Sequence, residues 1–124
     1  MRINNFEDVI SWQKGKELYL ELAKDLRTSR DFSFNDQLFR AALSVTNNIA
    51  EGFDRGSDKG LKQFLIIARG SCAEVRLMLH IASVDGKITQ QKYKKLVDLT
   101  MEISRLLTGF IVMLATRDKR LETT

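Results

Sequence analysis

The chain has 124 residues, 44% hydrophobic and 29% charged, which excludes a disordered chain and is typical of a single globular domain spanning residues 1–124. Its 20 basic residues exceed its 16 acidic ones by four, a mild excess that does not by itself indicate nucleic-acid binding. A lone cysteine excludes a disulfide within the chain, so the expected compartment is a reducing cytoplasm.

The absence of proline and the scattered positions of the seven glycines favour helices over β-hairpins. Four segments repeat apolar residues at spacings of three and four, which predicts four amphipathic helices. No uninterrupted apolar run approaches the roughly 20 residues that cross a bilayer, so we expect no membrane segment.

The first predicted helix runs from Phe6 to Thr28 with Asn5 as its N-cap, and the second runs from Asp36 to Phe53 with Asn35 as its N-cap. Each has one apolar side. In the first helix this side consists of Phe6, Val9, Trp12, Leu18, Leu22 and Leu26, and in the second of Leu38, Ala42, Val45, Ile49 and Phe53.

The third predicted helix begins near the N-cap Ser57 and ends before Gly86, and Thr89 caps the fourth. The apolar side of the third consists of Leu61, Phe64, Ala68, Cys72, Val75, Leu79 and Ala82. That of the fourth consists of Tyr93, Leu96, Thr100, Ile103, Leu107, Phe110 and Leu114. Because short connections force consecutive helices to run antiparallel, the sequence predicts an all-α, up-and-down four-helix bundle.

The residues that enzymes and metal sites need are missing. A di-iron bundle requires two Glu-x-x-His pairs, but His80 is the single histidine and Leu77 stands three residues before it. His80 and Cys72 are about 12 Å apart along one helix, too far to share a metal or to form a nucleophile pair. Cys72 falls on the apolar side, where a thiol is a structural residue. We therefore predict no catalytic residue, no metal and no cofactor.

The fourth helix has more apolar residues than one core requires. Leu99, Leu106 and Met113 repeat every seven positions on a second line beside the inward side. Either the inward side is simply wide, or the second line is an interface between copies of the chain. We favour the second interpretation, which predicts a homo-oligomer.

The second helix also carries a polar line, made of Arg40, Ser44, Asn48, Glu51 and Arg55. One interpretation is a hydrogen-bonded contact between helices or subunits, with Glu51 and Arg55 spaced for an ion pair. The other is a recognition surface for a polar partner such as RNA.

The order of residues in this segment is distinctive: Gln37, Leu38, Phe39, Arg40, Ala41, Ala42, Leu43, Ser44 and Val45, followed by Asn48, Ile49, Ala50, Glu51, Gly52 and Phe53. It resembles the helical proteins encoded in intervening sequences of bacterial 23S ribosomal RNA genes. Residues of the first and third helices agree with that family: Phe6, Val9, Trp12, Gln13, Lys14, Phe64, Leu65, Ile67, Ala68, Arg69, Gly70, Ser71 and Glu74.

The resemblance implies a four-helix bundle, ring-like homopentamers and a bacterial cytoplasmic setting. Similar proteins include the accessory factor of diversity-generating retroelements, a partner of a reverse transcriptase and its RNA.

The leading functional hypothesis is a non-enzymatic, oligomeric helical module that binds RNA or a ribonucleoprotein. The predicted binding residues are Arg40, Asn48, Glu51, Arg55, Lys59, Lys62, Arg69 and Arg76. The alternative is a protein-binding adaptor or scaffold with no nucleic-acid role, using the line of Leu99, Leu106 and Met113.

Overall fold

The computed structural model describes residues 5–26 and 31–123, with side chains described as far as Arg117. A short 3₁₀ helix, η1, precedes four α-helices, and these ranges contain no strand. The elements are η1 (Phe6–Asp8), α1 (Ile10–Leu26), α2 (Phe32–Asp54), α3 (Asp58–Val84) and α4 (Gln90–Thr123). The predicted all-α class is confirmed.

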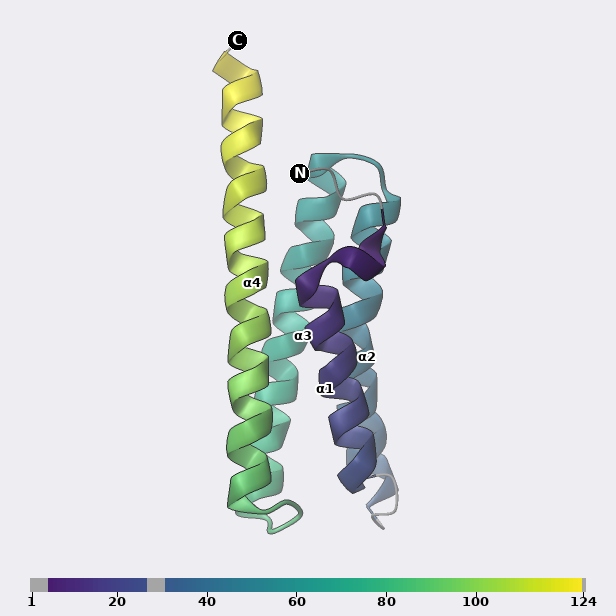
Figure 1. Cartoon of the computed structure of the whole chain (residues 1–124). Coiled ribbons are helices and arrows are strands. Elements are labelled where there is room, and N and C mark those ends of the chain that lie inside the picture. Colours follow the sequence, from purple (N-terminus) through teal and green to yellow (C-terminus); the bar gives the residue numbers. More distant parts are fainter. Residues whose placement is uncertain (1–4, 27–30, 124) are drawn as a thin grey trace.

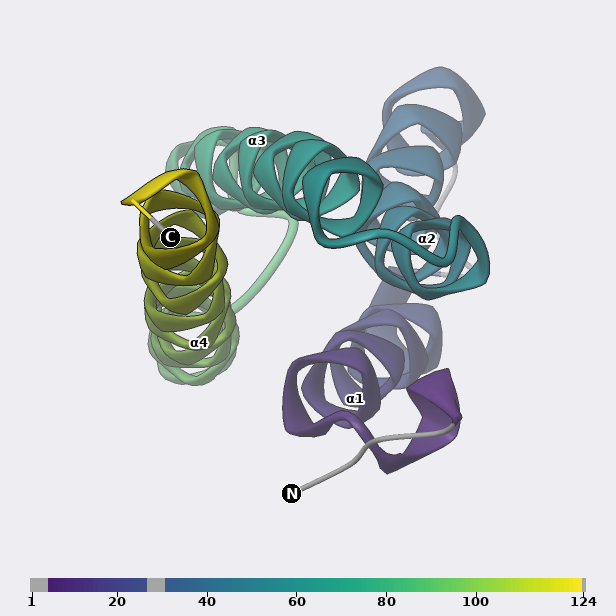
Figure 2. The ribbon, with the colours of Figure 1, turned by 90° about the horizontal axis from the view of Figure 1, so that it is seen from above.

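The helices form a closed ring in chain order. Each helix packs against the next, and α1 packs against α4, whereas the diagonal pairs α1–α3 and α2–α4 make no close backbone contact. Neighbouring helices run in opposite directions (Figures 1 and 2). This is the predicted up-and-down bundle.

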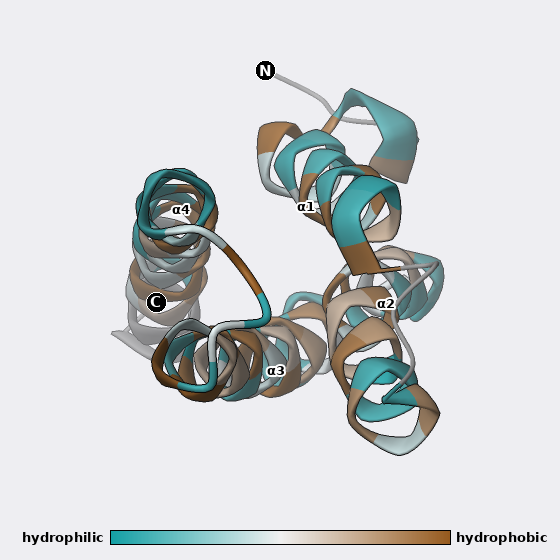
Figure 3. Ribbon diagram, turned by 90° about the horizontal axis from the view of Figure 1, so that it is seen from below, coloured by the Kyte–Doolittle hydropathy of each residue, from teal (hydrophilic) through white to brown (hydrophobic). Residues whose placement is uncertain are grey.

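The core occupies the space that the four helices enclose. Leucine, isoleucine and valine residues from all four helices are fully buried there, and partly buried aromatic rings pack against them. Hydrophobic and hydrophilic stretches alternate around the helices (Figure 3), as expected when one side of each helix is buried. Burial of this apolar surface is the main force that holds the helices together.

Three of the predicted helix ends are confirmed. The Ser57 hydroxyl accepts a hydrogen bond of 3.1 Å from the Gly60 amide, and the Thr89 hydroxyl accepts one of 3.1 Å from the Lys92 amide. Gly86 follows α3 with a φ of 76°, a left-handed conformation that glycine adopts without steric cost.

The predicted start of the first helix is wrong. Instead of one helix from Phe6, the chain forms the single turn η1, becomes extended at Val9 and starts again at Ile10. Val9 is buried by this bend, and the Gln13 side chain donates a hydrogen bond of 2.9 Å to the Glu7 carbonyl. The Asn5 side chain makes no capping bond. The predicted end at Thr28 lies outside the described residues.

The predicted N-cap of the second helix is also wrong. α2 begins at Phe32, and the cap is Asp31, whose carboxylate accepts a hydrogen bond of 3.2 Å from the Phe34 amide. Asn35 is instead buried inside the helix and donates a hydrogen bond of 3.0 Å to the Leu26 carbonyl. Asn35 thus joins the start of α2 to the end of α1, a tertiary role that outweighs its preference for a cap.

The helices differ greatly in length, since α1 has 17 residues and α4 has 34. The C-terminal part of α4 therefore extends past the other helices (Figure 1). Within the described residues, Gln90–Arg117 of α4 is long and apolar enough to cross a bilayer, with a mean hydropathy of 1.4 over 18 residues. This criterion concerns length and composition alone, and core helices of bundles also meet it, so the expectation of no membrane segment stays a prediction. The core residues Ile103, Leu107 and Leu114 contribute to this hydropathy.

Candidate functional site

In the part of the chain that the structure describes, the polar line on α2 makes one hydrogen bond to another helix, at Ser44. The hydroxyls of Ser44 on α2 and Ser71 on α3 lie 2.7 Å apart. The Asn48 amide donates to both the carbonyl and the hydroxyl of Ser44, at 2.7 and 2.9 Å. The half-buried Asn48 amide is thus hydrogen-bonded within α2 to the same serine that contacts α3, which supports the first interpretation for this part of the line.

Both arginines of the α2 line have carboxylate partners. Arg55 forms the expected ion pair with Glu51 at 2.8 Å, and its guanidinium lies 4.8 Å from the centre of the Phe64 ring. Arg40 pairs with Asp36 at 2.9 Å. These exposed pairs are worth little to stability, but each carboxylate offsets the positive charge beside it.

Glu51 lies in acidic surroundings. It lines a surface cavity between η1 and α2 together with Glu7 and Asp54, and the rings of Phe6 and Phe53 complete its walls. Of the predicted binding residues, the structure thus brings Glu51 together with Arg55, its ion-pair partner.

Arg69 and Arg76 lie on the edge of α3 that faces α4. The Arg69 guanidinium donates a hydrogen bond of 3.2 Å to the Thr108 hydroxyl. The Arg76 guanidinium lies 3.0 Å from the Met101 sulfur, which is a weak acceptor. Both partners are neutral, and neither arginine forms an ion pair within the described residues.

Two lysines of the predicted set lie nearer the start of α3. Lys59 is exposed, and Lys62 is half-buried with an interaction of its own. Lys62 stands seven residues before Arg69, so it shares the α3 edge that faces α4.

The structure adds one basic residue that the sequence analysis missed. Arg105 is exposed on α4, four residues after Met101 and three before Thr108, and it therefore stands on the same side of the helix as both. The side chains that hold Arg76 and Arg69 flank it. We call Arg69, Arg76 and Arg105 the arginine cluster. Including Arg105 would have required the register between α3 and α4, which a single sequence does not reveal.

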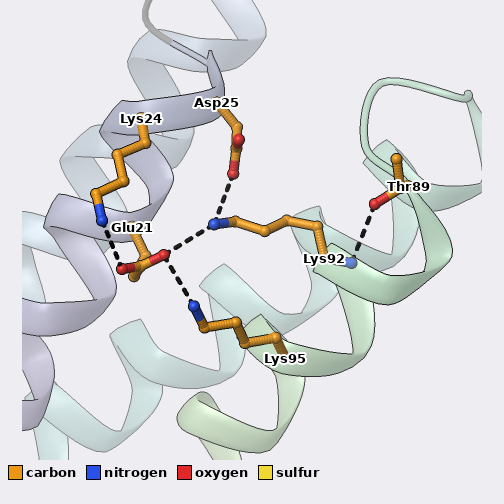
Figure 4. A network of polar contacts seen from close by, with 6 residues as sticks. All are labelled: Glu21, Lys24, Asp25, Thr89, Lys92 and Lys95. Atoms are coloured by element: carbon orange, nitrogen blue, oxygen red, sulfur yellow. Dashed lines mark hydrogen bonds and ion pairs between the residues drawn. The ribbon is translucent and has the colours of Figure 1, made fainter.

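On the flank of α4 that faces α1, the basic side chains form ion pairs with carboxylates. Lys92 lies 2.8 Å from both Glu21 and Asp25 on α1, and Lys95 lies 3.2 Å from Glu21 (Figure 4). Hydrogen bonds from Lys92, Lys24 and Lys95 lower the pKa of Glu21 to about 2. Burial lowers the pKa of Lys92, but hydrogen bonds to Asp25 and Glu21 raise it above its ordinary value overall.

The line of Leu99, Leu106 and Met113 faces α1 and changes along its length. Leu99 is 8% exposed and belongs to the core, Leu106 is half-buried, and Met113 is 46% exposed. Leu99 is therefore not available to another copy, and the prediction for that residue is wrong. The reason is that α1 covers only the first part of α4, so the line becomes accessible beyond it.

The Cys72 thiol is unsuited to nucleophilic chemistry. Burial raises its pKa to about 11, and the thiol donates a hydrogen bond to the Thr100 carbonyl at 3.2 Å. The described residues contain no group of three or more histidine, cysteine, aspartate or glutamate side chains that could hold a metal ion.

These features define a class, the antiparallel four-helix bundles whose distinctive chemistry lies on the surface rather than in the core. The sequence model of the 23S rRNA-intervening sequence proteins matches residues 7–109, and the chain belongs to that family. The resemblance seen in the sequence is thereby confirmed.

One solved structure with this fold is a protein of unknown function from the S23 ribosomal protein family of Bacteroides thetaiotaomicron VPI-5482. The two share 22% identity over 82% of this chain and 98% of that chain, with a TM-score of 0.77. This likeness shows the fold alone. No curated protein matches the chain.

Proposed function

We propose that this chain is a non-enzymatic, cytoplasmic helical module that associates with copies of itself and binds RNA or a ribonucleoprotein through the arginine cluster. One observation carries the RNA part of this proposal. Arg69 and Arg76 contact neutral atoms, whereas Arg40 and Arg55 are paired with carboxylates.

An arginine without a carboxylate partner keeps its full charge for a ligand. A guanidinium has five N–H donors, of which the contacts described use one in Arg69 and one in Arg76. The remaining donors suit the bidentate geometry of a phosphate. The family's link to a ribosomal RNA gene makes RNA the natural phosphate-bearing candidate for this chain.

Salt dependence tests the RNA part. We expect the full chain to bind a fluorescent, folded RNA hairpin at low salt, with an affinity that falls steeply as salt rises, because phosphate contacts release counterions. Anisotropy titrations at several salt concentrations measure this. Absence of binding at low salt would contradict the proposal.

Self-association is supported by exposed apolar side chains on α4, where Val112 is 58% and Met113 is 46% exposed. Light scattering of the purified chain should give the mass of more than one copy. We expect Met113→Glu to lower that mass without changing the helical circular dichroism. A monomeric parent chain would contradict this part.

The second candidate is a protein-binding adaptor with no nucleic-acid role. The outward side of α3 favours it, because it exposes five aliphatic side chains: Ile66, Ile67, Leu77, Ile81 and Val84. Leu77→Glu separates the two functions. It should abolish partner capture by an adaptor but leave RNA affinity nearly unchanged if the arginine cluster is the binding site.

A further inference from the structure

The arginine cluster has a spacing that restricts its ligand. The contacts Arg69–Thr108 and Arg76–Met101 fix the register of the antiparallel pair α3 and α4. At 1.5 Å per residue, Arg105 lies about 6 Å along α4 from the level of Arg76 and about 4.5 Å from that of Arg69. Measured along the helix axis, the three arginines thus stand at successive levels of the α3–α4 pair, about 4.5 and 6 Å apart.

Steps of this size are comparable to the separation of neighbouring phosphates along one strand of a nucleic acid. A scattered set of surface lysines would attract a polyanion without matching this repeat. Here two of the three guanidinium groups are also held by contacts to α4, which reduces the side-chain entropy lost when a ligand binds.

Few carboxylates compete for the cluster. On α4, Glu102 precedes Arg105 by one turn, but it lies 3.7 Å from Lys14 of α1. Asp98 is exposed one turn before Met101, and Glu74 is exposed on α3 two residues before Arg76. Neither forms an ion pair with the cluster. The seam therefore carries three arginines beside two exposed acids.

The seam offers little surface for stacking bases. Helices α3 and α4 contain three phenylalanine or tyrosine residues, Phe64, Tyr93 and Phe110, and one exposed histidine, His80, which follows Arg76 by four residues. The Phe64 ring lies under Arg55, the Tyr93 ring contacts His80, and the Phe110 ring contacts Phe53. All three rings are at least half-buried. Proteins that bind single strands combine a basic groove with several aromatic side chains that stack successive bases, and here the one exposed ring is that of His80.

We infer that the arginine cluster binds consecutive phosphates on one strand of double-helical RNA, and that it prefers the duplex to an unstructured single strand regardless of sequence. This inference rests on the proposed RNA-binding function and specifies its ligand. A duplex presents its phosphates at fixed spacing and hides its bases. A site that contacts only the backbone does not need access to the bases, so it can bind the duplex fully. A flexible single strand must first be ordered, and stacking on one histidine ring offsets little of that cost.

The test compares two RNA ligands on the full chain by anisotropy: a short blunt-ended duplex and an oligouridylate of the same length. Stacking on an aromatic side chain contributes about 1 to 3 kcal/mol per base, and a single strand loses most of this contribution here. We therefore expect the duplex to bind at least about tenfold more tightly. A second duplex of unrelated sequence should bind like the first.

The variant Arg76→Gln/Arg105→Gln should lower the slope of log affinity against log salt by about 2, or about 1 per lost contact. Arg40→Gln/Arg55→Gln is the matched control, because it removes the same net charge from arginines that have carboxylate partners. It should leave the slope unchanged. Circular dichroism checks that both variants are folded.

The possible outcomes separate this inference from the function on which it rests. If oligouridylate binds as tightly as the duplex, RNA binding stands and the duplex preference is wrong. If the control changes the slope as much as the cluster variant, the site is elsewhere. If neither RNA binds at low salt, both the function and the inference fail.

Discussion

The two flanks of α4 use basic side chains in different ways. Toward α1, Lys92 and Lys95 are bound to the carboxylates of Glu21 and Asp25, and these contacts close the ring of helices. On the flank that faces α3, Arg69 and Arg76 of α3 contact a hydroxyl and a thioether of α4.

The difference shows why a net charge of +4 says little about a ligand. A lysine that is paired with two carboxylates contributes to the fold, and its charge is already compensated. An arginine beside neutral atoms contributes less to the fold and keeps its charge for a partner. The location of carboxylates therefore distinguishes compensated from uncompensated basic residues, which the net charge does not.

The largest expected effect concerns Leu99, which is buried on the flank of α4 that faces α1. Leu99→Ala should destabilise the fold by about 2 to 5 kcal/mol, because it leaves a cavity where Leu99 is 8% exposed. Met113→Ala, farther along the same line, should cost less than about 0.5 kcal/mol in a single folded chain. Urea unfolding measures both, and equal losses would show that α1 does not cover Leu99.

A smaller effect tests the ion pairs of that flank. Lys92→Met should destabilise the fold by about 1 kcal/mol, because it leaves Glu21 and Asp25 without their shared partner. Lys94→Met is the control, since Lys94 is exposed and has no ion pair among the described residues. Comparable unfolding midpoints for the two variants would refute a structural role for Lys92.

The smallest effect concerns acid. The pKa of Glu21 in the folded chain is about 2, against an ordinary value of 4.5, so its contribution to stability is complete above pH 4.5. That contribution is lost as the pH falls from about 4.5 toward 2. Glu21→Gln should therefore reduce the difference between the thermal unfolding midpoints at pH 6 and pH 3.

The exposed residue Glu74 provides the comparison for this acid effect. Glu74→Gln should leave the difference between the two midpoints as it is in the parent chain. An unchanged difference in Glu21→Gln would mean that the contacts to Lys92, Lys24 and Lys95 do not hold the Glu21 carboxylate in its charged form.

Apolar periodicity was enough to predict the architecture, because four amphipathic helices with short connections have few ways to bury their apolar sides. The caps at Ser57 and Thr89 were predictable because they depend on neighbouring residues alone. The errors at Asn35 and Val9 have a different origin. Their conformations depend on contacts with segments distant in the sequence, which local preference does not encode.

The candidate site was predictable only in part. Arg69 and Arg76 were included because they are among the basic residues nearest the segment of the second helix that resembles the family. Arg40 and Arg55 were included for the same reason, and they are ion-paired. Arg105 was omitted because it lies 29 residues from Arg76 in the sequence. Pairing of charges and the register of two helices are tertiary properties, and these decide which cations can receive a phosphate.

The most direct measurement compares the two flanks in one assay, the salt dependence of affinity for an RNA duplex. Arg76→Gln/Arg105→Gln and Lys92→Gln/Lys95→Gln remove equal charge from the α3 and α1 flanks of α4, and both are measured at a temperature where circular dichroism shows them folded. The account predicts that the arginine variant lowers the slope by about 2 and that the lysine variant leaves it near the parent value. Equal slopes for the two variants, or a greater loss in the lysine variant, would contradict it.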